Sequence, residues 1–195
     1  MTTPDENVSE FYALRDKHML FHGAVGVIAS GWAMLEFQMN QCIWLLADLN
    51  PVAGACITAQ IVPLGSRIDC LLALMKLRSI DPKWIVKLNA FKQMAYGTGE
   101  KRNRLIHDPV VYNRRDSGVG QIEITARGTP VYRVKPVDQK DIDALHKEIT
   151  KRLSEFGDIR NAIFAARKTL PQIPAPEADP MQVTFVLDAP SRPAG

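Results

Sequence analysis

Apolar residues that recur at steps of three and four residues constrain this chain more than any other feature of its sequence. The last segment with this pattern runs from about Asp138 or Asp141 to Leu170, and charged residues fill its other side. Its apolar members are Ile142, Leu145, Ile149, Leu153, Phe156, Ile163 and Leu170. Because an α-helix has 3.6 residues per turn, these residues share one face. The segment is therefore predicted to be an amphipathic helix that packs on a core.

Three earlier segments share this periodicity. The first covers residues 8–49, with an expected break near Gly23–Gly26, and the second covers residues 63–79. The third begins at Asp81-Pro82, which has the residue types of a helix cap and a first helical position. It ends at Asp108-Pro109, because a residue before proline is pushed out of the helical region. We predict an all-α fold, an up-and-down bundle of four to five helices.

Residues 110–136 have a different character. Residues 110–112, 121–126 and 131–135 are rich in β-branched and aromatic side chains, and Arg127-Gly128-Thr129-Pro130 separates the last two runs. This pattern predicts a small β-hairpin inserted before the last helix. Residues 1–170 are expected to form a single domain. Residues 171–195 contain six prolines and are expected to be a Pro-rich tail without a compact fold, although residues 181–187 suit one strand.

Charge is concentrated in one segment. The 195-residue chain has a net charge of +3, which by itself does not indicate a polyanionic partner. Five cationic side chains and one anionic side chain lie between Lys101 and Arg115, so the rest of the chain is close to neutral. Such a cluster is typical of a local anion-binding site.

Several classes of protein are not indicated. Cys42, Cys56 and Cys70 contain no closely spaced pair, as a metal knuckle or a redox dithiol requires, and they suit a reducing compartment. The N-terminus is polar and acidic, unlike a signal peptide. The longest apolar stretch, residues 19–35, contains a histidine and three glycines and falls short of the ~20 residues that cross a bilayer. We expect a cytoplasmic protein with a buried core helix here, and with no membrane partner, metal or cofactor.

The third predicted helix ends in Arg102-Asn103-Arg104-Leu105-Ile106-His107. An arginine, a polar residue directly after it, an aliphatic pair and a histidine in this order resemble the Arg-x(4–6)-His motif of the HEPN superfamily (higher eukaryotes and prokaryotes nucleotide-binding domains). The earlier segment with Trp32 and Glu36 is similar to the first helix of several bacterial HEPN-like families. The resemblance covers residues from about 20 to 170. The hairpin departs from it, and the tail has no counterpart in it.

The resemblance implies a single HEPN-like bundle domain that forms a homodimer. Arg102 and His107 of both subunits would line one cleft. Active members of the superfamily are metal-independent endoribonucleases, whereas other members bind nucleotides or proteins. The implied partners are a second copy of the chain, RNA or a nucleotide and, in a defence or toxin–antitoxin setting, a cognate antitoxin protein.

The residue types fit this chemistry. Histidine exchanges protons near neutral pH, which contributes about 10²–10⁴-fold to a rate. Arg102 would present a planar set of donors to phosphate oxygens, and Asn103 would orient the phosphate or the imidazole. Asn103 lies four residues before His107 and thus on the same helix face. Arg102 lies about 140° away around the helix. Either the helix distorts before its end or a second subunit completes the cleft.

Three further residues are assigned to a supporting role. Glu36 falls on the apolar stripe of the first helix, where a carboxylate is costly unless it is paired. Arg102, Arg104 or Arg67 could pair with it, in a structural salt bridge or to orient an active-site arginine. Lys101 and Arg104 are expected to lie behind the catalytic residues or to contact RNA.

Three functions remain open on the sequence alone. The first is a HEPN-like metal-independent endoribonuclease, and the second is a HEPN-like dimer that binds a nucleotide or RNA without cutting it. The third is a helical protein-interaction module in which the spacing of Arg102 and His107 is accidental. The helix dipole alone favours cations in a last helical turn by about 0.3–1 kcal/mol, with no function required.

Overall fold

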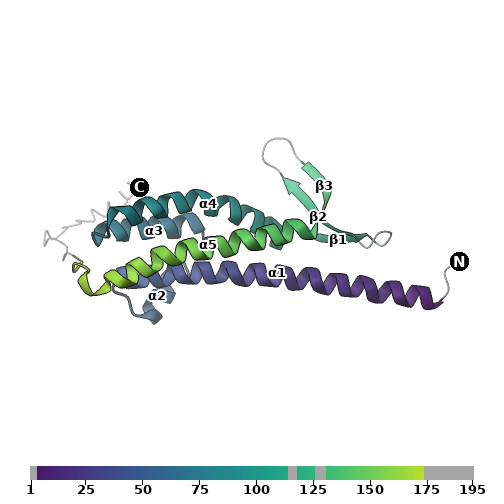
Figure 1. The fold of residues 1–195 in the computed structure, drawn as a ribbon, viewed down its shortest axis with the longest axis horizontal. Helices are drawn as coiled ribbons and strands as arrows, with labels where there is room; N and C mark the ends of the chain where they lie inside the picture. The colour runs from purple at the N-terminus through teal and green to yellow at the C-terminus, as the bar shows by residue number, and fades with distance from the viewer. Residues whose placement is uncertain (1–3, 114–117, 126–130, 174–195) are drawn as a thin grey trace, which may run out of the picture.

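The computed structural model describes residues 4–113, 118–125 and 131–173, and it contains five helices, a three-stranded sheet and a short 3₁₀ turn (Figure 1). The helices are α1 (Pro4–Leu46), α2 (Pro51–Thr58), α3 (Leu64–Leu77), α4 (Pro82–His107) and α5 (Gln139–Ala166). The strands are β1 (Val110–Asn113), β2 (Gly118–Thr125) and β3 (Val131–Pro136), and η1 (Arg167–Thr169) follows α5. The predicted helical bundle with a β insertion before the last helix is confirmed.

α1 and α3 run in the same direction because α2 turns the chain back. Glu36 of α1 pairs with Arg67 near the start of α3. The carbonyl of Leu46, at the end of α1, accepts a hydrogen bond from Arg78, just after α3. The eight residues of α2 and the loop after it therefore return the chain along α1. α2 is a helix that the periodicity did not predict. With it the described residues contain five helices, the upper limit of the four to five expected.

α4 runs antiparallel to α5. Phe91 of α4 packs on Phe156 of α5 with ring centroids 5.6 Å apart, and further along α4 Lys101 pairs with Glu148, earlier in α5. α1 also packs along α5. α1, α4 and α5 therefore run side by side along the length of the bundle (Figure 1).

α3 covers only one half of this three-helix frame. Gly65, in the first turn of α3, lies so close to Tyr96 in the middle of α4 that a Cβ there would be 2.0 Å from the tyrosine hydroxyl. The second half of α4 extends beyond this point. The bundle therefore has a closed end, where α3 completes it, and an open end, where α1, α4 and α5 stand without it.

One continuous core joins the four long elements. Fully buried members come from each of α1, α3, α4 and α5, among them Ile28, Leu35, Met39, Ile68, Leu71, Leu88, Phe91, Phe156 and Ile163. The expected break near Gly23–Gly26 is wrong, because α1 is one continuous helix from Pro4 to Leu46. Each interior glycine costs about 1 kcal/mol relative to alanine. Burial of Phe21 and Ile28 on either side of the pair outweighs that cost.

The apolar stretch of α1 is buried on one side only. Residues Arg15–Leu46 form a helix that is long and apolar enough to cross a membrane by length and composition. Residues 19–35 were expected to be a buried core helix, and Ile28 and Leu35 are indeed fully buried. Val27 and Met34, on the other side, are 53% and 51% exposed. One side of this stretch is thus buried and the other is exposed, and the exposed side also carries apolar side chains.

The inserted sheet is antiparallel with the order β1–β2–β3, so β1 adds a third strand to the predicted hairpin. Val110 of β1 pairs with Gln121 of β2, and Ile122 of β2 pairs with Val134 of β3. The Gln121 amide donates to the carbonyls of Arg104 and Leu105 in the last turns of α4. The Arg104 carbonyl also accepts the backbone N–H of Asp108, whereas the Leu105 carbonyl is one that a helix end leaves without an intrahelical partner, so the sheet caps α4.

A buried arginine ties the closed end together. The side chain of Arg78 is 2% exposed, and its Nε donates to the Leu46 carbonyl at 2.7 Å. Its two other nitrogens contact the Asp48 carboxylate and the Pro171 carbonyl. Arg78 thus joins the end of α1, the end of α3 and the segment after α5. The strand expected at residues 181–187 lies outside the described residues.

Candidate functional site

Asn103 and His107 lie on one face of α4, in its last two turns at the open end. Both side chains are exposed. Tyr96, seven residues before Asn103 and so on the same face, contacts α3 at Gly65. Asn103 and His107 therefore continue the side of α4 that α3 leaves uncovered. His107 is the last residue of the helix, and its ring makes no hydrogen bond or ion pair with the described residues.

Arg102 reaches this face although it does not start from it. Its Nε is buried and has no hydrogen-bond partner among the described residues, which places the base of the side chain in the packed side of α4. Its Nη1 donates to Oδ1 of the exposed Asn103 at 2.8 Å. The helix continues to His107 without distortion. The tip of Arg102 thus meets the side chain of Asn103, which lies on the same face of the helix as His107.

Arg102 differs from its cationic neighbours in its partners. Lys101 pairs with Glu148 at 2.6 Å, and Arg104 pairs with Glu123. Arg102 makes no ion pair with any acidic side chain in the described parts of the chain. Its guanidinium therefore keeps donors for an anion at an exposed surface.

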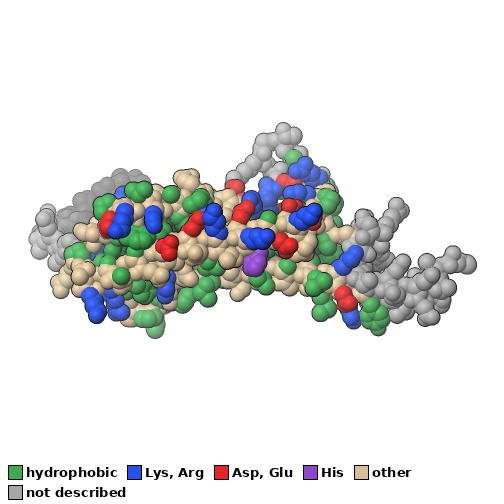
Figure 2. All heavy atoms as spheres, viewed as in Figure 1, with side chains coloured by type: hydrophobic (Ala, Val, Ile, Leu, Met, Phe, Trp, Pro, Cys, Tyr) green, Lys and Arg blue, Asp and Glu red, His purple; other side chains and the backbone are tan. Residues whose placement is uncertain are grey.

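Lys101 and Arg104 face a different part of the molecule. They line a pocket of about 350 Å³ between the end of α4, the sheet and the start of α5. Its charged lining is balanced, with four cations and four anions: Lys101, Arg104, Arg133, Lys135, Asp108, Glu123, Asp141 and Glu148. Figure 2 shows blue and red side chains gathered together over this end of the molecule. A balanced pocket offers no net charge to an anion.

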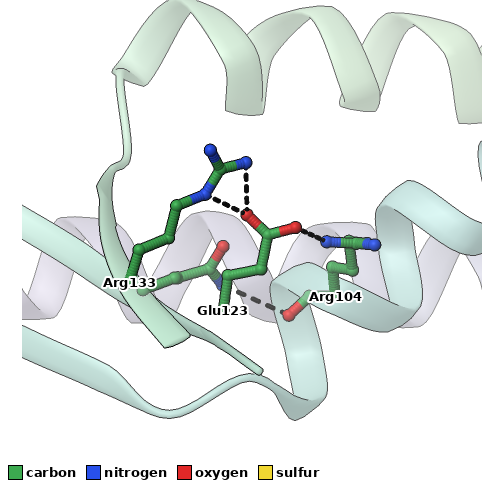
Figure 3. A network of polar contacts seen from close by, with 4 residues as sticks. Arg104, Glu123 and Arg133 are labelled. Atoms are coloured by element: carbon green, nitrogen blue, oxygen red, sulfur yellow. Dashed lines mark hydrogen bonds and ion pairs between the residues drawn. The ribbon is translucent and has the colours of Figure 1, made fainter. Parts of the chain in front are cut away.

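Glu123, which lines that pocket, is the centre of a polar network (Figure 3). Arg104 contacts one carboxylate oxygen, and Arg133 donates to the other at 2.8 Å. These hydrogen bonds, first that of Arg104 and then that of Arg133, hold the pKa of Glu123 below its ordinary value. In turn, the bond to Glu123 raises the pKa of Arg104. Arg104 is therefore engaged within the fold and is not directed at the face of His107.

Glu36 is paired with Arg67, one of the three arginines expected for it. Its Oε1 lies 2.9 Å from Arg67 Nη1 and accepts a hydrogen bond from Trp32 Nε1 at 3.2 Å. The Arg67 N–H does not point at the carboxylate oxygen, so the contact is an ion pair at close distance without a hydrogen bond. The Glu36 side chain is 31% exposed, and the Arg67 side chain is 11% exposed. Glu36 thus joins α1 to α3 and contacts neither Arg102 nor Arg104.

Two further histidines lie near the end of α4, at a contact that the sequence did not reveal. The Tyr112 hydroxyl lies 2.8 Å from His22 Nε2, and the Tyr112 ring stacks on His18 with centroids 3.3 Å apart. Burial raises the pKa of Tyr112. In the sequence, His18 and His22 stand four residues apart on α1. Their partner, Tyr112, comes from β1, 90 residues after His22. Within the described residues, no group of three His, Cys, Asp or Glu side chains could hold a metal ion.

The cysteines offer no competing nucleophile in the core. Burial raises the pKa of Cys42 to about 12, with a smaller opposing effect of Arg160. Burial also raises the pKa of Cys70. A thiol with a raised pKa is protonated at neutral pH and reacts poorly.

The exposed face thus joins an imidazole, a primary amide and a guanidinium, which together can bind a phosphate group and move a proton. Comparison of the chain with protein-family models, with curated proteins and with solved structures gave no match.

Proposed function

We propose that this chain is a HEPN-like, metal-independent endoribonuclease that acts as a homodimer. The observation that carries the proposal is the tip of Arg102, which turns to Asn103 on the face that Asn103 shares with His107. The guanidinium has no acidic partner among the described residues, while Lys101 and Arg104 on either side of it are paired. A cation left without an anion, at the end of a helix whose last residue is an exposed histidine, suits the binding of a phosphodiester.

Each residue has a role in RNA cleavage. The 2′-hydroxyl loses its proton and its oxygen attacks the adjacent phosphorus, and the bond to the 5′ oxygen breaks as that oxygen takes up a proton. The products are a 2′,3′-cyclic phosphate and a 5′-hydroxyl. His107 transfers a proton, and Arg102 stabilises the negative charge that develops on the phosphate oxygens, an effect worth about 10²–10³-fold. Asn103 holds the guanidinium in place.

The two proton transfers support a homodimer. One group must accept a proton from the 2′-hydroxyl, and one must donate a proton to the leaving oxygen. The exposed face of α4 carries a single imidazole, that of His107. A second copy of the chain would supply the second imidazole.

The test is cleavage of single-stranded RNA by the purified chain in EDTA. His107→Ala should lower the rate by at least about 100-fold, and His146→Ala is the matched control, because His146 is an exposed histidine on α5. Cleavage that requires a divalent ion, or equal rates for the wild type and His107→Ala, would refute the proposal. RNA binding without cleavage by the wild type would leave a non-catalytic RNA- or nucleotide-binding dimer.

A protein-interaction module is the second candidate, and a specific feature favours it. The side of α1 away from the core exposes large apolar side chains, among them Met19 at 65% and Leu20 at 72%. Contiguous exposed apolar surface marks sites of interaction with other proteins or membranes. This candidate would be favoured over the first if the chain neither cut nor bound RNA.

A further inference from the structure

Three aromatic side chains meet at the open end of the bundle, where β1 contacts α1. The Tyr112 hydroxyl lies 2.8 Å from Nε2 of His22, and the Tyr112 ring stacks on His18. We call these three residues the aromatic cluster. The contacts fix the rings within the cluster, and the His22 side chain is exposed. Exposed aromatic rings are the surfaces on which unpaired bases of RNA stack. The aromatic cluster therefore suits a nucleobase.

The aromatic cluster lies on the same side of the bundle as Asn103 and His107. His18 precedes Glu36 by a whole number of helical turns, so both residues lie on one side of α1. Glu36 marks this side as the one that α3 covers at the closed end. Asn103 and His107 likewise continue the side of α4 that meets α3 at the closed end. Both sets of residues thus border one surface, between α1 and α4, that α3 does not cover.

The aromatic cluster and His107 also lie at a similar level along the bundle. α4 runs antiparallel to α1 (Figure 1), and a Cβ on Gly99 of α4 would be 3.1 Å from the Trp32 ring. His107 follows Gly99 by about two turns, so it is level with about residue 24 of α1, close to His22. β1 begins soon after α4. The Cα atoms of His107 and Tyr112 are therefore at most about 18 Å apart.

The surface of α1 beside the His22 ring carries only small side chains. Gly26 comes one turn after His22, and a Cβ there would meet nothing within 4 Å. Ala29 and Ala33 continue the same side of α1 toward α3. Residues 18–35 contain no lysine, arginine, aspartate or glutamate. A flat, uncharged base can therefore lie against α1 while its phosphate faces the end of α4.

We infer that His22 stacks on an unpaired base of an RNA whose phosphate contacts Arg102 and His107. This deepens the proposed function and rests on it for the phosphate site, and it names the substrate class as single-stranded RNA. Tyr112 is a positioning residue: its hydroxyl fixes the His22 ring, and the stack on His18 holds Tyr112 in turn. Because Tyr112 engages its Nε2, His22 is assigned to base binding and not to proton transfer.

The test is the affinity of the full chain for a short single-stranded RNA with 2′-O-methyl riboses. This RNA keeps its bases and phosphates but lacks the hydroxyl that attacks in cleavage, so binding is measured whether or not the chain cuts RNA. Fluorescence anisotropy gives the dissociation constant. His22→Ala should weaken binding about 10-fold. His22→Phe should keep most of the affinity, because it retains a ring, and His146→Ala is the control, because His146 is an exposed histidine on α5.

A matched RNA shows whether the lost contact is with a base. An RNA of the same length without bases should bind the wild type and His22→Ala with equal affinity, because neither can stack on it. Tyr112→Phe removes only the hydroxyl that fixes His22. This variant should bind the intact RNA more weakly than the wild type does and the RNA without bases equally well. A merely structural role of Tyr112 would lower both affinities together.

Three results would overturn the inference: no RNA binding by the wild type, equal affinities of the wild type and His22→Ala for the intact RNA, or the same loss in His22→Ala with the RNA without bases. Tighter binding of duplex RNA or of adenosine 5′-monophosphate than of the single strand would overturn the substrate class. Loss of cleavage in a His22→Phe variant that still binds RNA would overturn the assignment to base binding. Binding that depends on His22 in a chain that never cuts RNA would refute the proposed function and leave the base site standing.

Discussion

The two ends of the bundle satisfy their polar groups in opposite ways. At the closed end, where α3 packs beside α4, the buried guanidinium of Arg78 has a partner for each of its three nitrogens. At the open end, the guanidinium of Arg102 has, among the described residues, a buried Nε without a partner and a tip held only by Asn103. The donors of Arg78 are thus used within the fold, whereas Arg102 keeps donors for a ligand. The closed end uses its polar groups to hold the fold together, and the open end leaves donors and a proton carrier exposed.

The largest effect on stability is expected at the closed end. Arg78→Ala removes the donor for the Leu46 carbonyl and for the Pro171 carbonyl. An unsatisfied buried acceptor costs about 1–3 kcal/mol, so the free energy of unfolding should fall by about 2–4 kcal/mol. Urea unfolding measures this change, with the exposed Arg15→Ala as the control. Equal midpoints for the two variants would show that Arg78 does not tie this end together.

The largest effect on activity is expected at the open end. Arg102→Ala should lower the rate of RNA cleavage about 100- to 1,000-fold, because a donor aimed at the developing phosphate charge is lost. Its melting temperature should fall only slightly, because the lost hydrogen bond to Asn103 is exposed and only the base of the side chain packs against the bundle. The matched variant is Arg104→Ala, which loses only the ion pair with Glu123. It should cleave RNA at close to the wild-type rate. Similar losses in both variants would remove the distinction between the two faces of α4.

Periodicity was sufficient to predict what the core dictates. The predicted stripe of α5 from Ile142 to Ile163 is buried apart from the half-buried Leu153, because the three-to-four-residue repeat places its apolar side chains on one face of the helix. α2 was missed because its eight residues are apolar on all sides: Val52 is 77% and Ile57 is 48% exposed, so no stripe stands out. The glycines of α1 were expected to break it, but local helix propensity is weaker than packing along the bundle.

Side-chain partners were harder to predict than elements. The sequence indicated that Glu36 needs a cation and named three arginines, but only the direction of α3 selects Arg67. The role of Arg78 could not be predicted, because a single arginine after a helix belongs to no periodic pattern. The contact of Arg102 with Asn103 could not be predicted, since the helix period fixes where a side chain starts and not where a long one ends.

A smaller effect is expected where the two ends meet. Glu36→Ala leaves Arg67 without its partner at the start of α3. A fully buried pair would cost about 3–5 kcal/mol, but the Glu36 side chain is 31% exposed, so we expect a loss of about 1–2 kcal/mol. Chemical denaturation measures it, and Glu36→Gln should recover part of the loss, because an amide oxygen can still accept from Trp32 Nε1. No loss in Glu36→Ala would mean that α3 is held by its apolar side chains alone.

The smallest effect concerns the paired side of α4 and depends on pH. Arg104 and then Arg133 hold the pKa of Glu123 below its ordinary value, so the folded chain favours the ionised carboxylate more than the unfolded chain does. The resulting stability is present above the ordinary pKa of a glutamate, about 4, and is lost as the pH falls through the lowered value. Glu123→Gln lacks a group that titrates, so its melting temperature should fall less between pH 5 and pH 3, on the order of a few degrees, than that of the wild type. Asp158→Asn, which changes an exposed carboxylate of α5 instead, should follow the wild type. Parallel curves for Glu123→Gln and the wild type would mean that the two arginines do not hold this carboxylate, and Arg104 would then be as available to RNA as Arg102.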